Sequence, residues 1–266
     1  MAASGAPPGR VRMLTDDQLL RYNRQILLPS WDVAAQTRLA TASVLVVGLG
    51  GLGCPLAQQL TLAGVGRLLL ADFDRVELSN LQRQMLHHDA DIGRYKVESA
   101  RDSLVALRAD VIVDVLAERM EEASLLRALA RVDVVADCSD NFATRELINR
   151  CAWRLKKPVV SAAAIAWQGQ LSVFDANHSG SACYRCLYPA SDDAALTCSE
   201  NGVMTTTVAV MGSWQAQEVL KVLTGTGESL CGHLLLWDGR VNEVRRVRTP
   251  RDPACPVCSN QGDVLS

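Results

Sequence analysis

The stretch Ser43–Gly53 has the sequence SVLVVGLGGLG, in which a short, mostly apolar run leads directly into a glycine-rich turn. An apolar run of this length, bounded by glycines, is typical of a buried strand. A helix is expected next, at about Cys54–Ala63, and a second apolar strand at Arg67–Asp72. These segments predict a β-α-β unit with parallel strands, because such crossovers are right-handed and join parallel neighbours.

The same alternation continues along the chain. Helices are expected at Lys96–Leu107, Glu121–Ala130 and Ala143–Lys156, and strands at Val111–Leu116, Val132–Asp137 and Pro158–Ala162. Five strands in this rhythm predict an α/β fold with a Rossmann-like, mostly parallel sheet and helices on both faces.

The two ends of the chain differ from this central part. Residues 1–14 are expected to form a flexible tail, followed by a helix at Thr15–Leu28. Beyond Gln168 the sequence predicts an antiparallel β extension, with strands at Gln170–Phe174, His233–Trp237 and Val241–Val244. A helix at Val203–Thr224 is expected between these strands, and Gly225 is placed to end it.

The charge and the apolar runs of the chain argue against several classes of function. The formal net charge of -2 provides no basic surface of the kind that nucleic-acid binding needs. Met1–Arg12 lacks the apolar core of a signal peptide, and glycines and polar residues interrupt every apolar run before it reaches membrane-spanning length. We therefore expect a cytoplasmic protein that binds neither nucleic acid nor membranes.

The glycine-rich turn indicates a nucleotide. Gly48, Gly50 and Gly53 match the G-x-G-x-x-G fingerprint, and Asp72 follows about twenty residues later, where a ribose-binding carboxylate is expected. Glycines allow backbone amides to approach phosphate at a helix N-terminus. By itself this pattern also fits NAD or FAD, as in a nicotinamide-dependent oxidoreductase, or a tight turn without a ligand.

The residues that follow favour a triphosphate over a redox dinucleotide. Asp72–Gln84 has the sequence DFDRVELSNLQRQ, and Lys96 begins the next helix. Cleavage of a triphosphate needs fixed cations and usually a metal, and Arg83 and Lys96 can be those cations. Asp140 follows a predicted strand at its carboxyl end, where it can hold Mg²⁺; the neighbouring Asn141 is either a ligand contact or a helix cap.

Two C-x-x-C pairs predict a structural zinc site. They are Cys183 with Cys186 and Cys255 with Cys258, and four thiolates suit a closed tetrahedral zinc site. The long gap between the pairs means that the metal would clip the C-terminal part of the chain onto its middle. A redox C-x-x-C and unrelated buried cysteines are the alternatives. Cys198 lies in a polar, loop-like segment and is a candidate nucleophile without a visible base.

Taken together, these motifs resemble the ThiF/MoeB/HesA family, the bacterial relatives of ubiquitin-activating enzymes. The resemblance extends from about Thr15 to Cys258 and includes Arg21–Ile26 (RYNRQI) and Ser79–Gln84 (SNLQRQ). It implies an adenylyltransferase that uses ATP and Mg²⁺ to adenylate the C-terminal glycine of a small β-grasp, ubiquitin-like sulfur carrier ending in Gly-Gly. Within the family, the segment Leu196–Glu200 and the Asp72–Asp74 motif are most similar to members that act on the small subunit of molybdopterin synthase, in molybdenum cofactor biosynthesis.

The resemblance also assigns roles to residues. Arg24, Arg83, Lys96 and Asp140 would be the catalytic residues, and Arg24 would reach the site from a second subunit, which implies a homodimer. The predicted nucleotide-binding set is Gly48, Gly50, Gly51, Gly53, Asp72, Asp74, Ser79, Asn80, Leu81, Gln82, Arg83, Lys96, Asp140 and Asn141. The chain would be a single adenylation domain over residues 15–266, with its nucleotide-binding part at about 40–165 and its carrier-binding and zinc part at about 166–260.

Some questions stay open at this level. Ala162 stands where the family typically has glycine, and Thr205–Thr207 replaces a more apolar segment, so the carrier could instead be the one that serves thiazole synthesis. No rhodanese-like extension is visible, so we expect a separate sulfur donor of the cysteine desulfurase or rhodanese type. A non-catalytic nucleotide-binding scaffold is a further alternative, which the presence of all four catalytic candidates disfavours.

Overall fold

A single sheet organises the part of the chain that the computed structural model describes, residues 13–189 and 202–259. Its eight strands have the order β3-β2-β1-β4-β5-β6-β7-β8. The strands are β1 (Ser43–Val47), β2 (Arg67–Ala71), β3 (Ile112–Leu116), β4 (Val134–Asp137), β5 (Val159–Ile165), β6 (Gln168–Phe174), β7 (His233–Asp238) and β8 (Glu243–Arg248).

The first five strands form the predicted parallel sheet. β1 pairs in parallel with both β2 and β4, while β3 and β5 extend the sheet on either side. The chain therefore moves outward from β1 in one direction and then returns to continue in the other. Open α/β sheets bind ligands at this reversal point, beyond the carboxyl ends of the strands.

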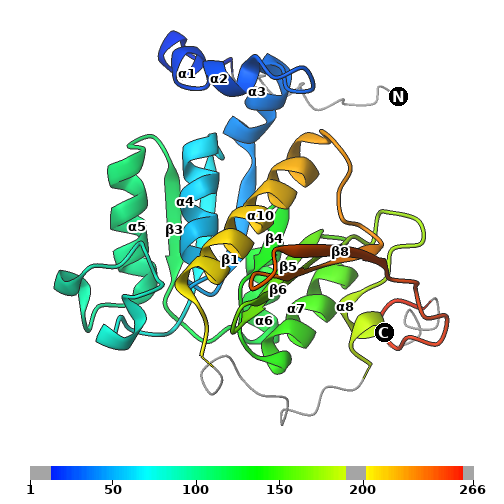
Figure 1. Ribbon diagram of the computed structural model, residues 1–266. Coiled ribbons are helices and arrows are strands. Elements are labelled where there is room, and N and C mark those ends of the chain that lie inside the picture. Colours follow the sequence, from blue (N-terminus) through cyan, green and yellow to red (C-terminus); the bar gives the residue numbers. More distant parts are fainter. Residues whose placement is uncertain (1–12, 190–201, 260–266) are drawn as a thin grey trace, which may run out of the picture.

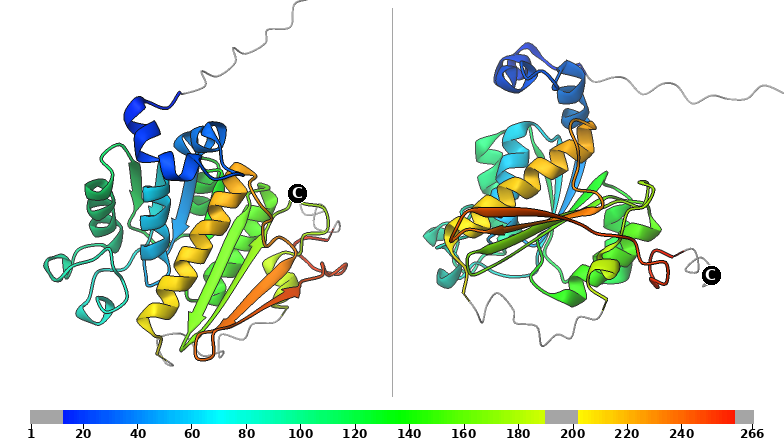
Figure 2. Two further views of the ribbon diagram at one scale, coloured as in Figure 1. Left: turned by 45° about the horizontal axis from the view of Figure 1, so that its top comes forward. Right: turned by 45° about the vertical axis from the view of Figure 1, so that its right-hand side comes forward.

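The last three strands form the predicted antiparallel extension. β6, β7 and β8 pair antiparallel in sequence, and β6 joins β5 in the same way, so the extension continues the parallel sheet without a break. β7 and β8 lie at the edge of the sheet farthest from the helix α5, Lys96–Leu107 (Figure 2). The final strand runs from Glu243 to Arg248, somewhat later than the predicted Val241–Val244.

Helices cover both faces of the sheet (Figure 1). Val44 and Val46 of β1 belong to a core with α4, α5 and α10, whereas Leu45 and Val47 belong to a second core with α6, α7 and α8. This alternation follows from the two-residue period of a strand. The helices are α1 (Asp16–Arg21), α2 (Asn23–Ile26), α3 (Val33–Thr41), α4 (Gly53–Ala63), α5 (Lys96–Leu107), α6 (Glu122–Leu129), α7 (Phe142–Arg154), α8 (Tyr184–Leu187) and α10 (Thr205–Thr224), with short 3₁₀ turns η1 (Leu78–Asn80) and η2 (Asp89–Asp91).

The N-terminal region differs from the single helix predicted at Thr15–Leu28. The chain breaks between α1 and α2 at Tyr22, whose buried side chain packs over Gly64 and receives a 3.2 Å hydrogen bond from Arg108. A further helix that we did not predict, α3, begins after Asp32, whose carboxylate accepts a 2.7 Å hydrogen bond from the Ala35 amide. Long-range packing of Tyr22 thus overrides local helical continuity.

The helix α10, the longest among the described residues, confirms the prediction at Val203–Thr224. It ends where Gly225 adopts a left-handed conformation with φ of 70°. No helix within residues 13–189 and 202–259 combines the length and apolar character needed to cross a membrane.

Candidate functional site

The glycine loop is a tight turn from β1 into α4. Gly48 has φ of +93°, and a Cβ there would lie 2.8 Å from the carbonyl oxygen of Cys138. A Cβ on Gly53 would lie 1.9 Å from the carbonyl oxygen of Gly48, so the two ends of the turn touch each other. Gly50 faces more open space, since its Cβ would meet only the Gln84 amide nitrogen, at 3.8 Å. The fingerprint therefore contains two packing glycines and one that leaves room for a ligand.

A cavity of about 290 Å³ opens beside this loop, at the carboxyl ends of β1, β2 and β4. This volume is at the lower end of the range typical of small-molecule sites. Ten residues of the predicted nucleotide-binding set line it: Gly48, Gly50, Gly51, Asp72, Asp74, Asn80, Arg83, Lys96, Asp140 and Asn141. Segments that are far apart in sequence thus meet where the fold predicts a ligand.

Asp72 joins the glycine loop to the lysine at the start of α5. Its carboxylate accepts hydrogen bonds from the Leu49 amide at 2.7 Å and the Asp74 amide at 2.8 Å. Burial raises the pKa of Asp72, while the positive charge of Lys96 and these two hydrogen bonds oppose the rise. Asp74 in turn accepts a 2.9 Å hydrogen bond from Lys96 Nζ. The Lys96 side chain is only 8% exposed, so its ammonium group is held at the cavity by an ion pair.

Asp140 and Asn141 lie between β4 and α7, on the opposite side of the glycine loop from Lys96 along the sheet order. Asp140 is exposed at the cavity, where its carboxylate is accessible to a metal–phosphate group. Asn141 caps α7, because its side-chain oxygen accepts a 2.9 Å hydrogen bond from the Thr144 amide. The capping role that we considered for Asn141 is therefore present, although the residue also borders the cavity.

Four residues of the predicted nucleotide-binding set are outside the cavity lining: Gly53, Ser79, Leu81 and Gln82. Gly53 serves the turn, as its contact with Gly48 shows. The Ser79 carbonyl oxygen accepts a 3.0 Å hydrogen bond from the Arg83 guanidinium group and so orients that group. Gln82 accepts hydrogen bonds from the Thr205 hydroxyl and so joins this segment to the start of α10. Gly53, Ser79 and Gln82 therefore hold the cavity-lining segments in place without lining the cavity themselves.

Arg24 lies far from the cavity within one chain. Arg24 is exposed on α2. The next residue, Gln25, donates a 3.1 Å hydrogen bond to the Ala63 carbonyl oxygen at the end of α4. The cavity lies at the other end of α4, next to Gly53. Figure 1 shows α1 to α3 together at one end of the molecule. An α4 of 11 residues separates the two by roughly 16 Å. Arg24 cannot act on a nucleotide in its own chain.

The cavity also contains residues that sequence analysis did not identify. Arg145 is buried on the first turn of α7 and donates hydrogen bonds to the carbonyl oxygens of Ser139 and Ala162. Arg119 lies over the Phe73 ring at 4.4 Å, where the two form a cation–π contact. Asp140 precedes α7 and lies five residues from Arg145, a spacing that does not place two residues on one helical face, so no local pattern indicated Arg145.

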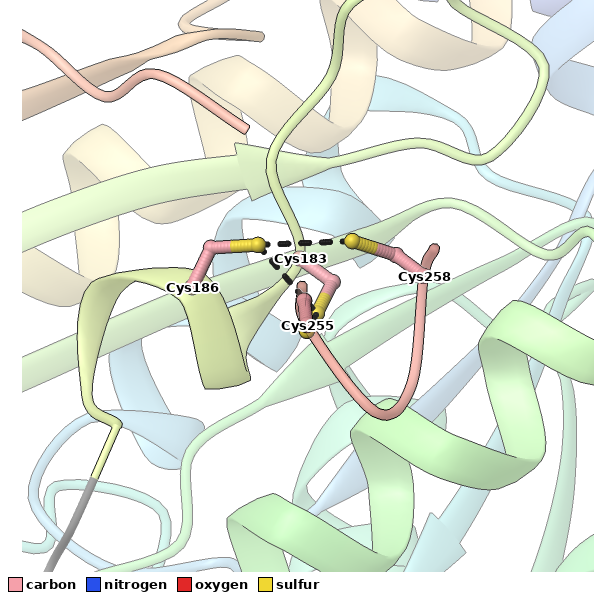
Figure 3. A group of neighbouring side chains, drawn as sticks. All are labelled: Cys183, Cys186, Cys255 and Cys258. Carbon is pink, nitrogen blue, oxygen red and sulfur yellow. Dashed lines mark hydrogen bonds between the residues drawn. The ribbon is translucent and has the colours of Figure 1, made fainter. Parts of the chain in front are cut away.

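The four predicted zinc ligands come together although 72 residues separate the two pairs. Cys183 Sγ lies 3.6 Å from Cys255 Sγ, and Cys186 Sγ lies 3.3 Å from Cys258 Sγ (Figure 3). All four sulfur atoms lie within 4.8 Å of one another. Tetrahedral zinc with Zn–S bonds of about 2.3 Å requires sulfur separations of roughly 3.8 Å, so the cluster fits such an ion.

Neighbouring groups support this cysteine cluster. The buried Asn149 of α7 donates a 3.6 Å hydrogen bond to Cys183 Sγ and accepts one from the Tyr184 amide. The Asp252 amide donates to Cys186 Sγ at 3.4 Å. Burial raises the pKa of Cys258. Zinc binds cysteine as the thiolate, so metal binding at this cluster would release protons. The other candidate cysteine, Cys198, lies outside the described residues.

Solved structures share this fold. Over 90% of this chain and 75% of the compared chain, it superposes on E. coli MccB in complex with MccA-N7isoASN, with a TM-score of 0.81 and 22% sequence identity. PaaA gives a TM-score of 0.75 at 23% identity, over 94% of this chain and 79% of the compared chain. At these identities the similarity concerns the fold.

Sequence relatives are much more similar. The molybdopterin-synthase adenylyltransferase of E. coli (strain K12) is 45% identical over 92% of this chain and 98% of its own length. The adenylyltransferase and sulfurtransferase MOCS3 of Sus scrofa is 46% identical over 94% of this chain, which spans 55% of that protein. The model of the ThiF family matches residues 22–257. The resemblance predicted from the motifs is thereby confirmed, and the chain belongs to the ThiF family.

Proposed function

We propose that the protein is an adenylyltransferase that activates the C-terminal glycine of a small β-grasp sulfur carrier, the small subunit of molybdopterin synthase. The observation that carries this proposal is the cavity in which the glycine loop meets Lys96, Arg83 and Asp140. The similarity to a molybdopterin-synthase adenylyltransferase over nearly the whole of both chains supports the choice of carrier. The activated carrier would serve molybdenum cofactor biosynthesis.

The reaction joins two anions. A carboxylate oxygen of the carrier attacks the α-phosphorus of ATP, the bond from that phosphorus to the β-bridging oxygen breaks, and diphosphate leaves. Because the nucleophile is already ionised, the site needs no general base, and its residues must neutralise charge and position the reactants. Lys96 and Arg83 line the cavity and supply positive charge. The Gly50 and Gly51 backbone borders the same space, where phosphates can approach amide groups.

A divalent cation fits beside Asp140. This carboxylate is exposed in the cavity, and together with phosphate oxygens it offers the oxygen ligands that Mg²⁺ prefers. When bound, Mg²⁺ would offset charge on the phosphates. Asp140 would then orient the triphosphate from the side opposite Lys96.

The cysteine cluster is proposed to hold structural Zn²⁺. Its four thiols are largely buried, and its position between α8 and the segment around Cys255 ties the C-terminal part of the described chain to α7. A metal that closes a loop of this length stabilises the folded state by restricting the unfolded chain.

A homodimer would complete the site. Arg24 is exposed and remote from the cavity of its own chain, so a partner subunit is the remaining source of the arginine that the resemblance implies. Mixing tests this idea: Arg24→Ala and Asp140→Ala variants, each inactive alone, should recover about one quarter of wild-type activity after subunit exchange. Half of the dimers are then mixed, and each mixed dimer contains one intact site. No recovery would exclude a shared site.

The remaining expectations belong to the same proposal. A separate protein of the cysteine desulfurase or rhodanese type would provide the sulfur that attacks the adenylate. Cys198 stays a predicted nucleophile with no structural test. Every cysteine that the structure describes is free, which suits the reducing cytoplasm in which we expect the protein to act.

Exchange of labelled diphosphate into ATP tests the adenylation step directly. We expect exchange that depends on a carrier with a free C-terminal diglycine and falls roughly hundredfold in Asp140→Asn. Asp89→Asn, a change in an exposed aspartate outside the cavity lining, should leave exchange unchanged. Parallel assays with a molybdopterin-type and a thiazole-type carrier identify the substrate. Exchange with neither carrier, or tight dinucleotide binding without ATP binding, would contradict the proposal.

A further inference from the structure

A buried imidazole lies behind the glycine loop. The His87 side chain is only slightly exposed, and its ring connects Leu49 with α5. Nε2 lies 3.2 Å from the Leu49 carbonyl oxygen, and Nδ1 lies 2.8 Å from Ser99 Oγ. A carbonyl oxygen can only accept, so Nε2 carries a proton and donates it to Leu49. Nδ1 shares a hydrogen bond with the Ser99 hydroxyl, which also bonds the Asp91 carboxylate. Burial lowers the pKa of His87.

The backbone of Leu49 is held on both sides. Its carbonyl oxygen accepts from His87 Nε2 and, at 3.3 Å, from the Cys54 thiol. Its amide donates to the Asp72 carboxylate at 2.7 Å. Leu49 lies between Gly48 and Gly50, both of which line the cavity. The conformation of the loop therefore depends on groups behind it as well as on the glycines themselves.

The first turn of α5 provides both ends of this arrangement. Ser99 holds His87, and Lys96, three residues earlier on the same helix, holds Asp74 through a 2.9 Å ion pair. The Asp72 carboxylate accepts hydrogen bonds from the amides of both Asp74 and Leu49. One helix end thus fixes the glycine loop through His87 and presents the phosphate-binding lysine through Asp74.

We propose that His87 is a positioning residue for nucleotide binding: it holds the Leu49 backbone in the conformation that receives the phosphates, and it couples this loop to the helix that carries Lys96. The inference rests on the proposed binding of ATP in the cavity. His87 does not line the cavity and acts on the nucleotide only through Leu49.

Two amide substitutions separate this role from simple packing. His87→Gln can place its amide N–H near the former Nε2 position and keep the hydrogen bond to Leu49. His87→Asn is shorter and can reach only the Ser99 side. Both remove the ring, so their losses of thermal stability should be similar. Loss of one oriented hydrogen bond corresponds to roughly a three- to tenfold change, so we expect His87→Asn to raise the Kd for MgATP by that factor and His87→Gln to stay within about twofold of wild type.

A second readout does not depend on ATP. Hydrogen exchange at the Leu49 amide, measured without nucleotide, should be faster in His87→Asn by a similar factor and close to wild type in His87→Gln. Ser99→Ala keeps the ring in place and should show the same increases on a smaller scale, with kcat for diphosphate exchange little changed at saturating ATP. It also provides the test if the His87 variants fail to fold.

Equal effects of the two His87 substitutions on hydrogen exchange at the Leu49 amide and on the Kd for MgATP would overturn the proposal. Wild-type values for both His87→Asn and Ser99→Ala would also overturn it. If the wild-type protein does not bind MgATP, the proposed function fails. The exchange of the Leu49 amide still decides whether His87 positions the loop.

Discussion

Replacement of Gly53 by alanine should destabilise the fold, although the added group is a single methyl. A Cβ at this position would lie 1.9 Å from the Gly48 carbonyl oxygen and 2.9 Å from its carbon, and contacts under 3.0 Å essentially never occur in real structures. Both atoms belong to the backbone of the turn, so no flexible side chain can move aside. The strand-to-helix connection itself must open by about an ångström.

The size of the effect follows from this contact. Forced overpacking typically costs about 1–3 kcal/mol. For a chain of this length, that loss corresponds to a decrease of roughly 3 to 10 °C in Tm. Because Gly53 also begins α4, the displaced turn should move Gly48 and Gly50 at the cavity, so affinity for MgATP should fall together with stability.

Gly50→Ala is the matched control. Its Cβ would meet only the Gln84 amide nitrogen at an ordinary contact distance of 3.8 Å, and its φ is not in the left-handed region. We expect its Tm to stay within about 2 °C of wild type, while its Kd for MgATP rises because Gly50 borders the space assigned to the phosphates. Calorimetric unfolding and titration with MgATP measure the two quantities. A Gly53→Ala protein as stable as wild type, or a Gly50→Ala protein that unfolds, would show that the contact between Gly53 and Gly48 does not constrain the turn.

Three further predictions concern other parts of the molecule. Lys96→Met should reduce carrier-dependent diphosphate exchange roughly hundredfold with the far-UV circular dichroism unchanged, since a fixed cation is lost from the cavity; exchange near the wild-type rate would contradict its role. Cys258→Ser should lose bound zinc, measured by metal analysis, and should unfold at lower temperature, whereas Cys151→Ser, outside the cluster, should keep its zinc. The hydrogen bond from Arg94 holds the pKa of Asp102 below its ordinary value of 3.8. The stability from this pair is therefore present above about pH 4 and lost as the pH falls through the folded pKa: Asp102→Asn should lower Tm slightly at pH 7 and not at pH 2, and a constant difference would exclude this cause.

Local signals in the sequence were sufficient for most elements. The apolar runs and their spacing predicted the five parallel strands, and the change of pattern after Gln168 predicted the antiparallel extension. The break at Tyr22 could not be predicted, because it depends on Gly64 and Arg108, which are distant in sequence. α3 was a missed signal: Asp32 is a regular N-cap, and its position before a run of helix-forming residues was visible.

Some residues of the candidate site could likewise be recognised from the sequence, and others could not. The glycine loop, the acids that follow the strands and the two cysteine pairs could be recognised from the sequence, because strand ends and short spacings bring such residues together in any fold of this class. The distance of Arg24 from the cavity of its own chain agrees with the second-subunit position that the family resemblance implied. Three-dimensional packing was needed to show that Arg145 borders the cavity and that His87 lies behind Leu49. These positions depend on helix packing and on the direction of each side chain, and a linear pattern does not specify either of them.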